Sequence, residues 1–295
     1  MQKIIADQKI FRDELLKCST SIEGKIEKIL PKNFTDSRLI EAMRYCILSN
    51  GKRIRPFLVL SSAKMFNVSQ EQALNTAIAI EFIHTYSLIH DDLPAMDDDD
   101  MRRGRLSCHK QFDEATAILA GDAFLTYAFE ILSDSETHED PAVRCQLISA
   151  IAKSSGFRGM VGGQMIDLEN CDQKISSEQI AKLHRLKTGE LFMCSVESGA
   201  ILGNASNMER KALRNFAHDL GLAFQIKDDI LDHCDNDNAK ADHNSNSSIV
   251  KTIGLANAKQ RLELLKSQAI THLSIFDSRS KSLTKLAEFV VSRDR

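Results

Sequence analysis

The fold of this chain is decided by the stretch EFIHTYSLIHDDLPAMD, residues 81–97. Its apolar residues recur at helical spacing, and the helical pattern ends in a cluster of aspartates. Asp91 and Asp97 are six positions apart, which does not fit one face of a regular helix. Pro94 is expected to break the helix end, so that Asp97 comes back toward Asp91.

A second acidic cluster, DDILD, covers residues 228–232 at the end of another apolar helical pattern. Asp228 and Asp232 are four residues apart and therefore project from one helix face. Carboxylates beside apolar helix faces call for a compensating cation. Two opposed acidic clusters could hold Mg²⁺ ions that bridge to a diphosphate. For residues 98–100, a solvated acidic loop is an equally good interpretation.

Bulk composition narrows the class of protein. The chain has 295 residues, of which 43% are hydrophobic and 27% charged, as expected of a soluble globular protein. The net charge of −3 gives no global field that would attract nucleic acid or an anionic membrane. The seven cysteines lack metal-ligand spacing, which indicates reduced thiols of a cytoplasmic protein. Neither a signal peptide nor a membrane-spanning run is expected.

Helical periodicity runs through almost the whole sequence, and strand signals are nearly missing. Ser69 and Ser176 precede two helical patterns and are expected to cap them. The polar stretch 235–248 is the one clear loop. We therefore predict one all-α domain over residues 1–295, a bundle of about ten or more helices around a central cavity.

Two basic segments accompany the acidic clusters. Residues 51–56, GKRIRP, open a helix, where the helix dipole also favours an anion. Residues 102–105, RRGR, directly follow the first acidic run. Arg53 and Arg105 are interpreted as solvated surface residues, whereas the positions of the other cations favour a role in binding: Lys52, Arg55, Arg102 and Arg103. Two basic sites and two acidic clusters imply two phosphorylated substrates, only one of them held by metal.

Two further positions are ambiguous from the residues alone. His84 lies two turns before Asp91, and either a core histidine or an anion ligand fits this place. Lys187-Thr188 lies within a helical pattern, and an ordinary surface pair is the default interpretation.

Together these motifs resemble the trans-isoprenyl diphosphate synthases, and among them the bacterial farnesyl diphosphate synthases (geranyltranstransferases). The resemblance covers residues 39–265 and rests on these segments: GKRIRP at 51–56, His84, SLIHDDLPAMD at 87–97, RRG at 102–104, GMVGGQ at 159–164 with Asp167, Lys187-Thr188, and FQIKDDILD at 224–232.

The resemblance implies a head-to-tail condensation of isopentenyl diphosphate with an allylic diphosphate, with about three Mg²⁺ ions, or Mn²⁺, as cofactor. It implies three sets of residues. The metal would bind Asp91, Asp92, Asp97 and Asp228. The allylic diphosphate would contact Arg102, Lys187 and Lys240, with the dipoles of Thr188, Gln225 and Gln164 near the carbocation. Isopentenyl diphosphate would bind Lys52, Arg55, His84 and Arg103.

Product length should depend on Tyr86 and Ser87, one turn deeper in the apolar cavity than Asp91. A bulky Tyr86 would stop growth near about fifteen carbons, giving farnesyl diphosphate. One departure from the family lies after Asp232, where the loop is shortened. There Lys240 can replace the first expected lysine and residues 246–248 replace the second, so another residue is expected to compensate.

Several alternatives stay open. The product could be geranyl or geranylgeranyl diphosphate, or the chain could be a non-catalytic partner subunit. A class I terpene cyclase would differ at the second acidic cluster, and a di-iron bundle would need a second Glu-x-x-His besides Glu81 and His84. The resemblance also implies a homodimer, and neither nucleic acid nor a membrane is expected as a partner.

Overall fold

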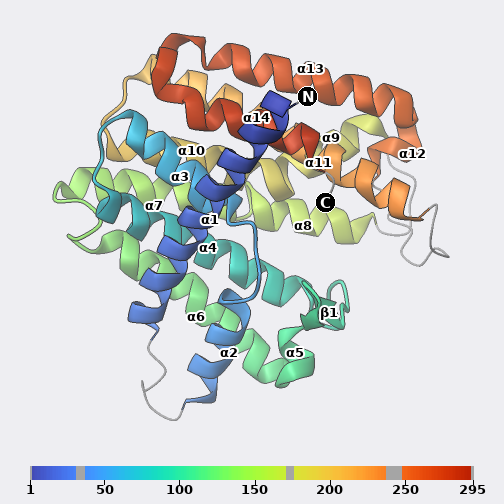
Figure 1. Ribbon diagram of the computed structural model, residues 1–295. Coiled ribbons are helices and arrows are strands. Elements are labelled where there is room, and N and C mark those ends of the chain that lie inside the picture. The colour runs from blue at the N-terminus through green and yellow to red at the C-terminus, as the bar shows by residue number, and fades with distance from the viewer. Residues whose placement is uncertain (1, 31–36, 171–175, 237–247, 294–295) are drawn as a thin grey trace.

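Nearly every element is a helix in residues 2–30, 37–170, 176–236 and 248–293, the part of the chain that the structure, a computed structural model, describes (Figure 1). The α-helices are α1 (Gln2–Ile29), α2 (Arg38–Ile47), α3 (Ile54–Met65), α4 (Gln70–Asp91), α5 (Cys108–Gln111), α6 (Glu114–Ser133), α7 (Pro141–Ser155), α8 (Met160–Glu169), α9 (Ser177–His184), α10 (Glu190–Leu202), α11 (Asn207–Asn236), α12 (Ile249–Ile253), α13 (Leu255–His272) and α14 (Lys281–Ser292). The predicted all-α fold is confirmed.

Side-chain caps fix where several helices begin. The Ser69 hydroxyl accepts a hydrogen bond from the backbone N–H of Gln72 at the start of α4. Ser176 and Gln179 form a reciprocal capping box at the start of α9. Both predicted starts are confirmed. These caps satisfy backbone donors that the first helical turn leaves without partners.

The central helix is α4, which carries the first acidic cluster at its carboxyl end. Its buried residues face all directions, from Ala77 and Ile78 to Phe82 and Ile83, as expected of a helix in the interior of a bundle. It packs against α3 on one side and α6 on another, and Figure 1 shows it between them. Because α4 is fixed on several sides, the position of Asp91 at its end is fixed as well.

A second, smaller apolar cluster supports the second acidic cluster. It contains Ala223, Ile226 and Ile230 of α11, Ile249 and Val250 of α12, and residues of α13. The acidic residues of α11 alternate with these buried positions. The core behind α11 therefore holds the helix face that presents Asp228.

The chain departs from the predicted helices after residue 97. A short antiparallel hairpin pairs β1 (Met101–Arg102) with β2 (Arg105–Leu106). Arg103 and Gly104 link the two strands with positive φ angles of 54° and 75°, the backbone that a two-residue hairpin turn requires. This local turn is why a helical pattern did not continue here.

One helix also departs from the expectation that no segment could span a membrane. By length and composition alone α6 could cross one, with a mean hydropathy of 1.4. It carries Asp122 and Glu130 and packs against α4, α2 and α7, as a core helix would. However, only 33% of the apolar window is buried, and Ile118 and Leu119 are exposed. The helix therefore has one buried face and one accessible apolar face.

Candidate active site

The first acidic cluster folds back on itself as the sequence predicted. Asp91 is the last residue of α4, and its carbonyl oxygen accepts a hydrogen bond of 2.8 Å from the backbone N–H of Asp97. Leu93 accepts two more, from Met96 and Asp98. The expected return of Asp97 toward Asp91 is thus confirmed. The two carboxylates now belong to one site although six positions separate them.

Asp91 is a carboxyl group in an unfavourable place for its charge. Burial raises the pKa of Asp91 to about 7, and the neighbouring carboxylate of Asp97 raises it further, while the Lys187 ammonium acts in the opposite direction. A buried carboxylate beside another carboxylate is stabilised by a cation that both can share. The first cluster therefore has the electrostatics of a cation site.

Two helical segments face the first cluster from across the cavity. A π-helical turn, Arg185–Gly189, carries Lys187, whose ammonium pairs with Asp167 of α8 at 2.7 Å. Gly163 of α8 permits this approach, because a Cβ there would collide with the backbone nitrogen of Lys187. On the same helix, the Gln164 amide donates a 3.2 Å hydrogen bond to Asp97. Lys187 is thus not a member of an ordinary surface pair, since it joins two helices beside the acidic cluster.

Asp92 points to a different neighbourhood from Asp91. Only 3% of Asp92 is exposed, and its carboxylate accepts hydrogen bonds from the guanidinium of Arg102, one of them 2.9 Å long. Arg102 also pairs with Asp99 at 3.1 Å. The predicted metal role of Asp92 therefore stays a prediction, because a cation would compete there with Arg102.

The second acidic cluster is engaged by the chain itself. Asp228 accepts a hydrogen bond from Arg293, and Asp229 accepts one of 2.7 Å from the backbone N–H of Ile249 at the start of α12. Burial raises the pKa of Asp228, while Arg293 and Lys52 lower it. Asp232 is exposed one turn further along α11. Only Asp228 of this cluster faces the cations.

Arg293 is a residue of the site that the sequence interpretation did not find. It is 3% exposed, and its guanidinium stacks on the Phe224 ring at 4.1 Å while pairing with Asp228. A compensating cation was expected because the second lysine after Asp232 is missing, but nothing marked position 293. Lys240, the replacement predicted for the first lysine, lies outside the described residues.

The predicted site residues line two adjoining cavities. The first is largely apolar, with a volume of about 350 Å³, and among its lining residues are Tyr86, Ser87, Asp91, Met96, Met160, Gln164 and Lys187. The second is polar, with a volume of about 550 Å³, and is lined among others by Lys52, Arg102, Arg103, Phe192, Gln225 and Asp228. Both cavities share Arg55, His84, Leu88 and Thr188. Asp91 and Asp228 thus belong to one continuous region.

The shared residues are electrostatically tuned by their surroundings. Burial lowers the pKa of Arg55 to about 10, and its guanidinium lies 5.0 Å from the Phe192 ring centre. The pKa of His84 is lowered well below its usual range by burial and by the guanidinium groups of Arg55 and Arg103. His84 is therefore neutral near pH 7 and can donate a hydrogen bond to an anion without adding charge.

The interpretation of Arg53 as a solvated residue is wrong. Only 3% of Arg53 is exposed, and it pairs with the buried Glu81 at 2.6 Å and donates to the carbonyl oxygens of Ile47 and Ser49. The carboxylate of Glu81 needs a counter-charge in the core, which sequence spacing does not reveal. Arg105 is exposed as predicted and stacks on Tyr45.

The carboxylates around the cavities suit a hard divalent cation. Carboxylate oxygens are the ligands that Mg²⁺ and Mn²⁺ prefer, and Asp91 with Asp97 forms a pair that a cation can share. Asp228 could complete the site from the polar cavity once Arg293 moves away. The described residues thus contain an aspartate-rich region able to bind divalent metal.

Comparisons with known proteins agree with this geometry. The family described as polyprenyl synthetase matches residues 36–266, and this chain belongs to that family. The resemblance inferred from the motifs is thereby confirmed.

Among the relatives, farnesyl diphosphate synthase of Geobacillus stearothermophilus is 39% identical over 93% of this chain and 95% of its own length. A chloroplastic geranylgeranyl pyrophosphate synthase of Capsicum annuum is 40% identical over 86% of this chain and 71% of its own. The apo crystal structure of an FPP/GFPP synthase from Zymomonas mobilis superposes with a TM-score of 0.88 at 43% identity, covering 97% of this chain and 100% of that one.

Proposed function

We propose that this chain is a prenyltransferase that condenses isopentenyl diphosphate with dimethylallyl and then geranyl diphosphate to give farnesyl diphosphate. One observation carries the proposal: an apolar cavity that begins at Asp91 adjoins a polar cavity lined by cations, with Arg55, His84 and Thr188 between them. A prenyl tail fits the apolar cavity, and a diphosphate fits each of its polar boundaries. Family membership and the relatives named farnesyl diphosphate synthase support the same activity.

Isopentenyl diphosphate is assigned to the polar cavity. Lys52, Arg55 and Arg103 offer cationic donors there, and neutral His84 offers a hydrogen bond. The Arg103 guanidinium, held by the Ser49 hydroxyl at 3.3 Å, is partly positioned before substrate arrives. This anion needs no metal, because side chains alone supply the countercharge.

The allylic diphosphate is assigned to the boundary between Asp91, Asp97 and Lys187. Bound Mg²⁺ would neutralise the diphosphate and favour its departure as a leaving group. Lys187 is placed by Asp167 to donate to the same anion. Arg102, held by Asp92 and Asp99, adds positive charge near the departing group. Thr188 and Gln225, on the lining, present dipoles to the carbocation that is left behind.

The apolar lining excludes water from the carbocation, which water would otherwise convert to an alcohol. The double bond of isopentenyl diphosphate forms the new carbon–carbon bond with the allylic cation. A proton then leaves the adjacent carbon, and the departed diphosphate is the base. The chain's part is to position both substrates and exclude water, so no protein nucleophile is required.

The direct test is incubation of the full chain with isopentenyl and dimethylallyl diphosphates and Mg²⁺, with the products identified by mass. We expect a fifteen-carbon (about C15) diphosphate as the main product. Absence of any longer diphosphate would favour the partner-subunit alternative. A ten- or twenty-carbon main product would identify the chain as a geranyl or geranylgeranyl diphosphate synthase instead.

The product-length proposal rests on Tyr86. Its ring is 93% buried, since only 7% is exposed, and it lines the apolar cavity one turn before Asp91. The Ser87 hydroxyl donates to the His84 carbonyl oxygen at 2.9 Å and adds little bulk. We expect Tyr86→Ala to lengthen the main product by at least one isoprene unit. Tyr45→Ala, outside this cavity, is the control, and unchanged product length in Tyr86→Ala would place the floor elsewhere.

We also propose a cytoplasmic homodimer built as one domain per chain. The accessible apolar face of α6, with Leu119 57% exposed and Ile118 43% exposed, is the surface that a second copy would cover. Leu119→Glu is expected to shift the chain to the monomer in size-exclusion chromatography with light scattering, whereas the exposed Met208→Glu leaves the mass unchanged. Equal masses for both variants would contradict the assignment of α6.

A further inference from the structure

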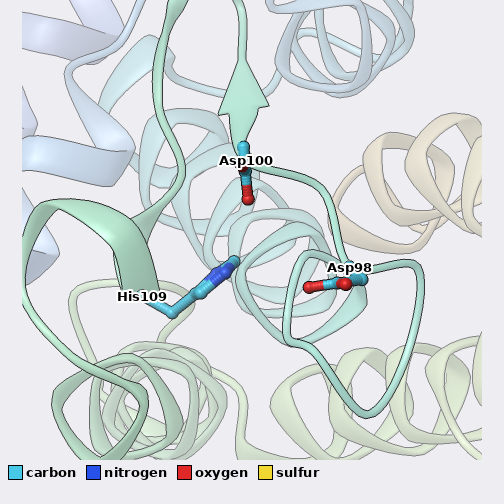
Figure 2. Close-up of side chains that lie close together, drawn as sticks. All are labelled: Asp98, Asp100 and His109. Atoms are coloured by element: carbon cyan, nitrogen blue, oxygen red, sulfur yellow. The ribbon is translucent and has the colours of Figure 1, made fainter.

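A group of possible metal ligands lies outside the two cavities, on the segment that follows the first acidic cluster. Asp98, Asp100 and His109 each offer one ligand atom, and these atoms lie within 4.8 Å of one another. Figure 2 shows the His109 ring directed into the space between the two carboxylates. None of the three lines the apolar or the polar cavity.

The histidine supplies a second and independent observation. His109 is only 7% exposed, and its Nε2 atom is buried without a hydrogen-bond partner among the described residues. Its other nitrogen, Nδ1, is 3.1 Å from the Ser107 hydroxyl, which fixes the orientation of the ring. A buried ring nitrogen normally has a partner, and a metal-bound histidine normally has its other nitrogen held as here.

We propose that Asp98, Asp100 and His109 form a second metal site, for a transition-metal dication of the Mn²⁺ or Zn²⁺ class. An imidazole nitrogen with two carboxylates suits these ions, whereas Mg²⁺ prefers oxygen ligands alone. Both aspartates are exposed, so water can fill the remaining coordination positions. The site is distinct from the Mg²⁺ that the prenyl transfer uses, and it does not depend on the proposed function.

The one competing contact is with Lys110, whose ammonium pairs with Asp100 Oδ1 at 2.8 Å. That pair is largely in solvent, with 40% and 67% of the two side chains exposed, so it holds Asp100 weakly. A carboxylate also has two oxygens, and metal binding can use the one that the lysine does not. The backbone position of Asp100 is secured separately, because its carbonyl oxygen accepts a 2.9 Å hydrogen bond from Ser107.

A bound ion would fasten the ends of the hairpin segment to each other. Asp98 and Asp100 precede β1, and His109 follows β2 within α5. Between them lie Arg102 and Arg103, which line the polar cavity. The ion therefore acts as a structural clamp on the segment that delivers two cations to the active site.

The test uses the full, metal-free chain with Mn²⁺ alone and no diphosphate. Pulsed electron paramagnetic resonance detects nitrogen bound to Mn²⁺. We expect a ¹⁴N coupling in the wild type and in Asp91→Asn, and its loss in His109→Gln. His138→Gln, a histidine in the loop before α7, is the matched control and keeps the coupling. We expect the affinity for Mn²⁺ in Asp98→Asn to fall by about 10- to 100-fold.

Persistence of the nitrogen coupling in His109→Gln, or its absence from the wild type, would overturn the proposal. Should His109→Gln fail to fold by circular dichroism, the exposed Asp98→Asn decides, since it leaves the core intact. An unchanged Mn²⁺ affinity in that variant means that the cluster is a solvated acidic loop. Added Zn²⁺ is further expected to displace Mn²⁺, since it binds such ligands more tightly.

Discussion

The two acidic clusters of this chain are prepared for a cation in opposite ways. In the first, a backbone hydrogen bond between Asp91 and Asp97 brings the carboxylates together, and the nearest ammonium, Lys187, is held by Asp167. In the second, Asp228 is already neutralised by a buried arginine, Arg293. The first cluster is thus a strained anionic pair, and the second is an ion pair that must open.

This difference separates two tasks that look identical in the sequence. The first cluster gains most from a divalent ion, because the pKa of Asp91, raised by burial to about 7, reports a charge without full compensation. The second gains less, since a metal has to displace Arg293 before Asp228 becomes a ligand. The comparison predicts that the first cluster determines the reaction rate and the second the metal concentration at which the site closes.

The largest effect is expected from Asp91→Asn. Without this carboxylate the cation at the first cluster loses its most buried ligand, so we expect kcat to fall by about 10²- to 10³-fold. Steady-state kinetics at saturating Mg²⁺ measures the change. Asp13→Asn, an exposed aspartate on α1, is the matched control. A fall of less than tenfold would mean that Asp97 alone carries the first cluster.

The first cluster was predictable from the sequence because its determinants are local. Pro94 and the spacing of the aspartates lie within one short segment, and the hydrogen bond from Asp97 to Asp91 confirms what they indicate. The all-α fold and the caps at Ser69 and Ser176 follow from equally local patterns. Local periodicity therefore fixed most of the helices and half of the site.

The rest depends on contacts between distant segments. Arg293 reaches Asp228 across 65 positions, and no spacing rule connects them. Arg53 pairs with Glu81 across 28 positions, which turned a residue expected in solvent into a core cation. The π-helical turn that carries Lys187 likewise depends on Gly163 of another helix. Tertiary packing decides such positions, so a single sequence could not predict them.

A smaller effect, on stability, is expected from His184, which immediately precedes the π-helical turn beside the first cluster. Burial lowers the pKa of His184 to about 4. Between about pH 4 and 6.5 the unfolded chain therefore binds more protons than the folded chain, and stability rises with pH over this window. It is fully present above about pH 6.5 and lost as the pH falls toward 4. The loss is on the order of 3 kcal/mol.

Urea denaturation of the metal-free chain at several pH values measures this change. In His184→Gln the rise in stability between pH 4 and 6.5 should shrink by the contribution of one proton, because the titrating ring is gone. His218→Gln, with a 41% exposed side chain in the wild type, is the control and keeps the rise. An identical pH dependence in wild type and His184→Gln would show that the support of the first cluster does not titrate here.

The smallest effect tests the second cluster directly. Arg293→Ala removes the guanidinium that holds Asp228 and should leave this carboxylate accessible to Mg²⁺. An ion pair with one partner exposed to solvent contributes about 1 kcal/mol at most, so we expect the half-saturating Mg²⁺ concentration to fall by about fivefold. Mg²⁺ titration of the steady-state rate measures it, with the exposed Arg261→Ala as control. A rise in the required Mg²⁺ would show that Arg293 orients Asp228 for the metal rather than competing with it, and the two clusters would then be prepared in the same way.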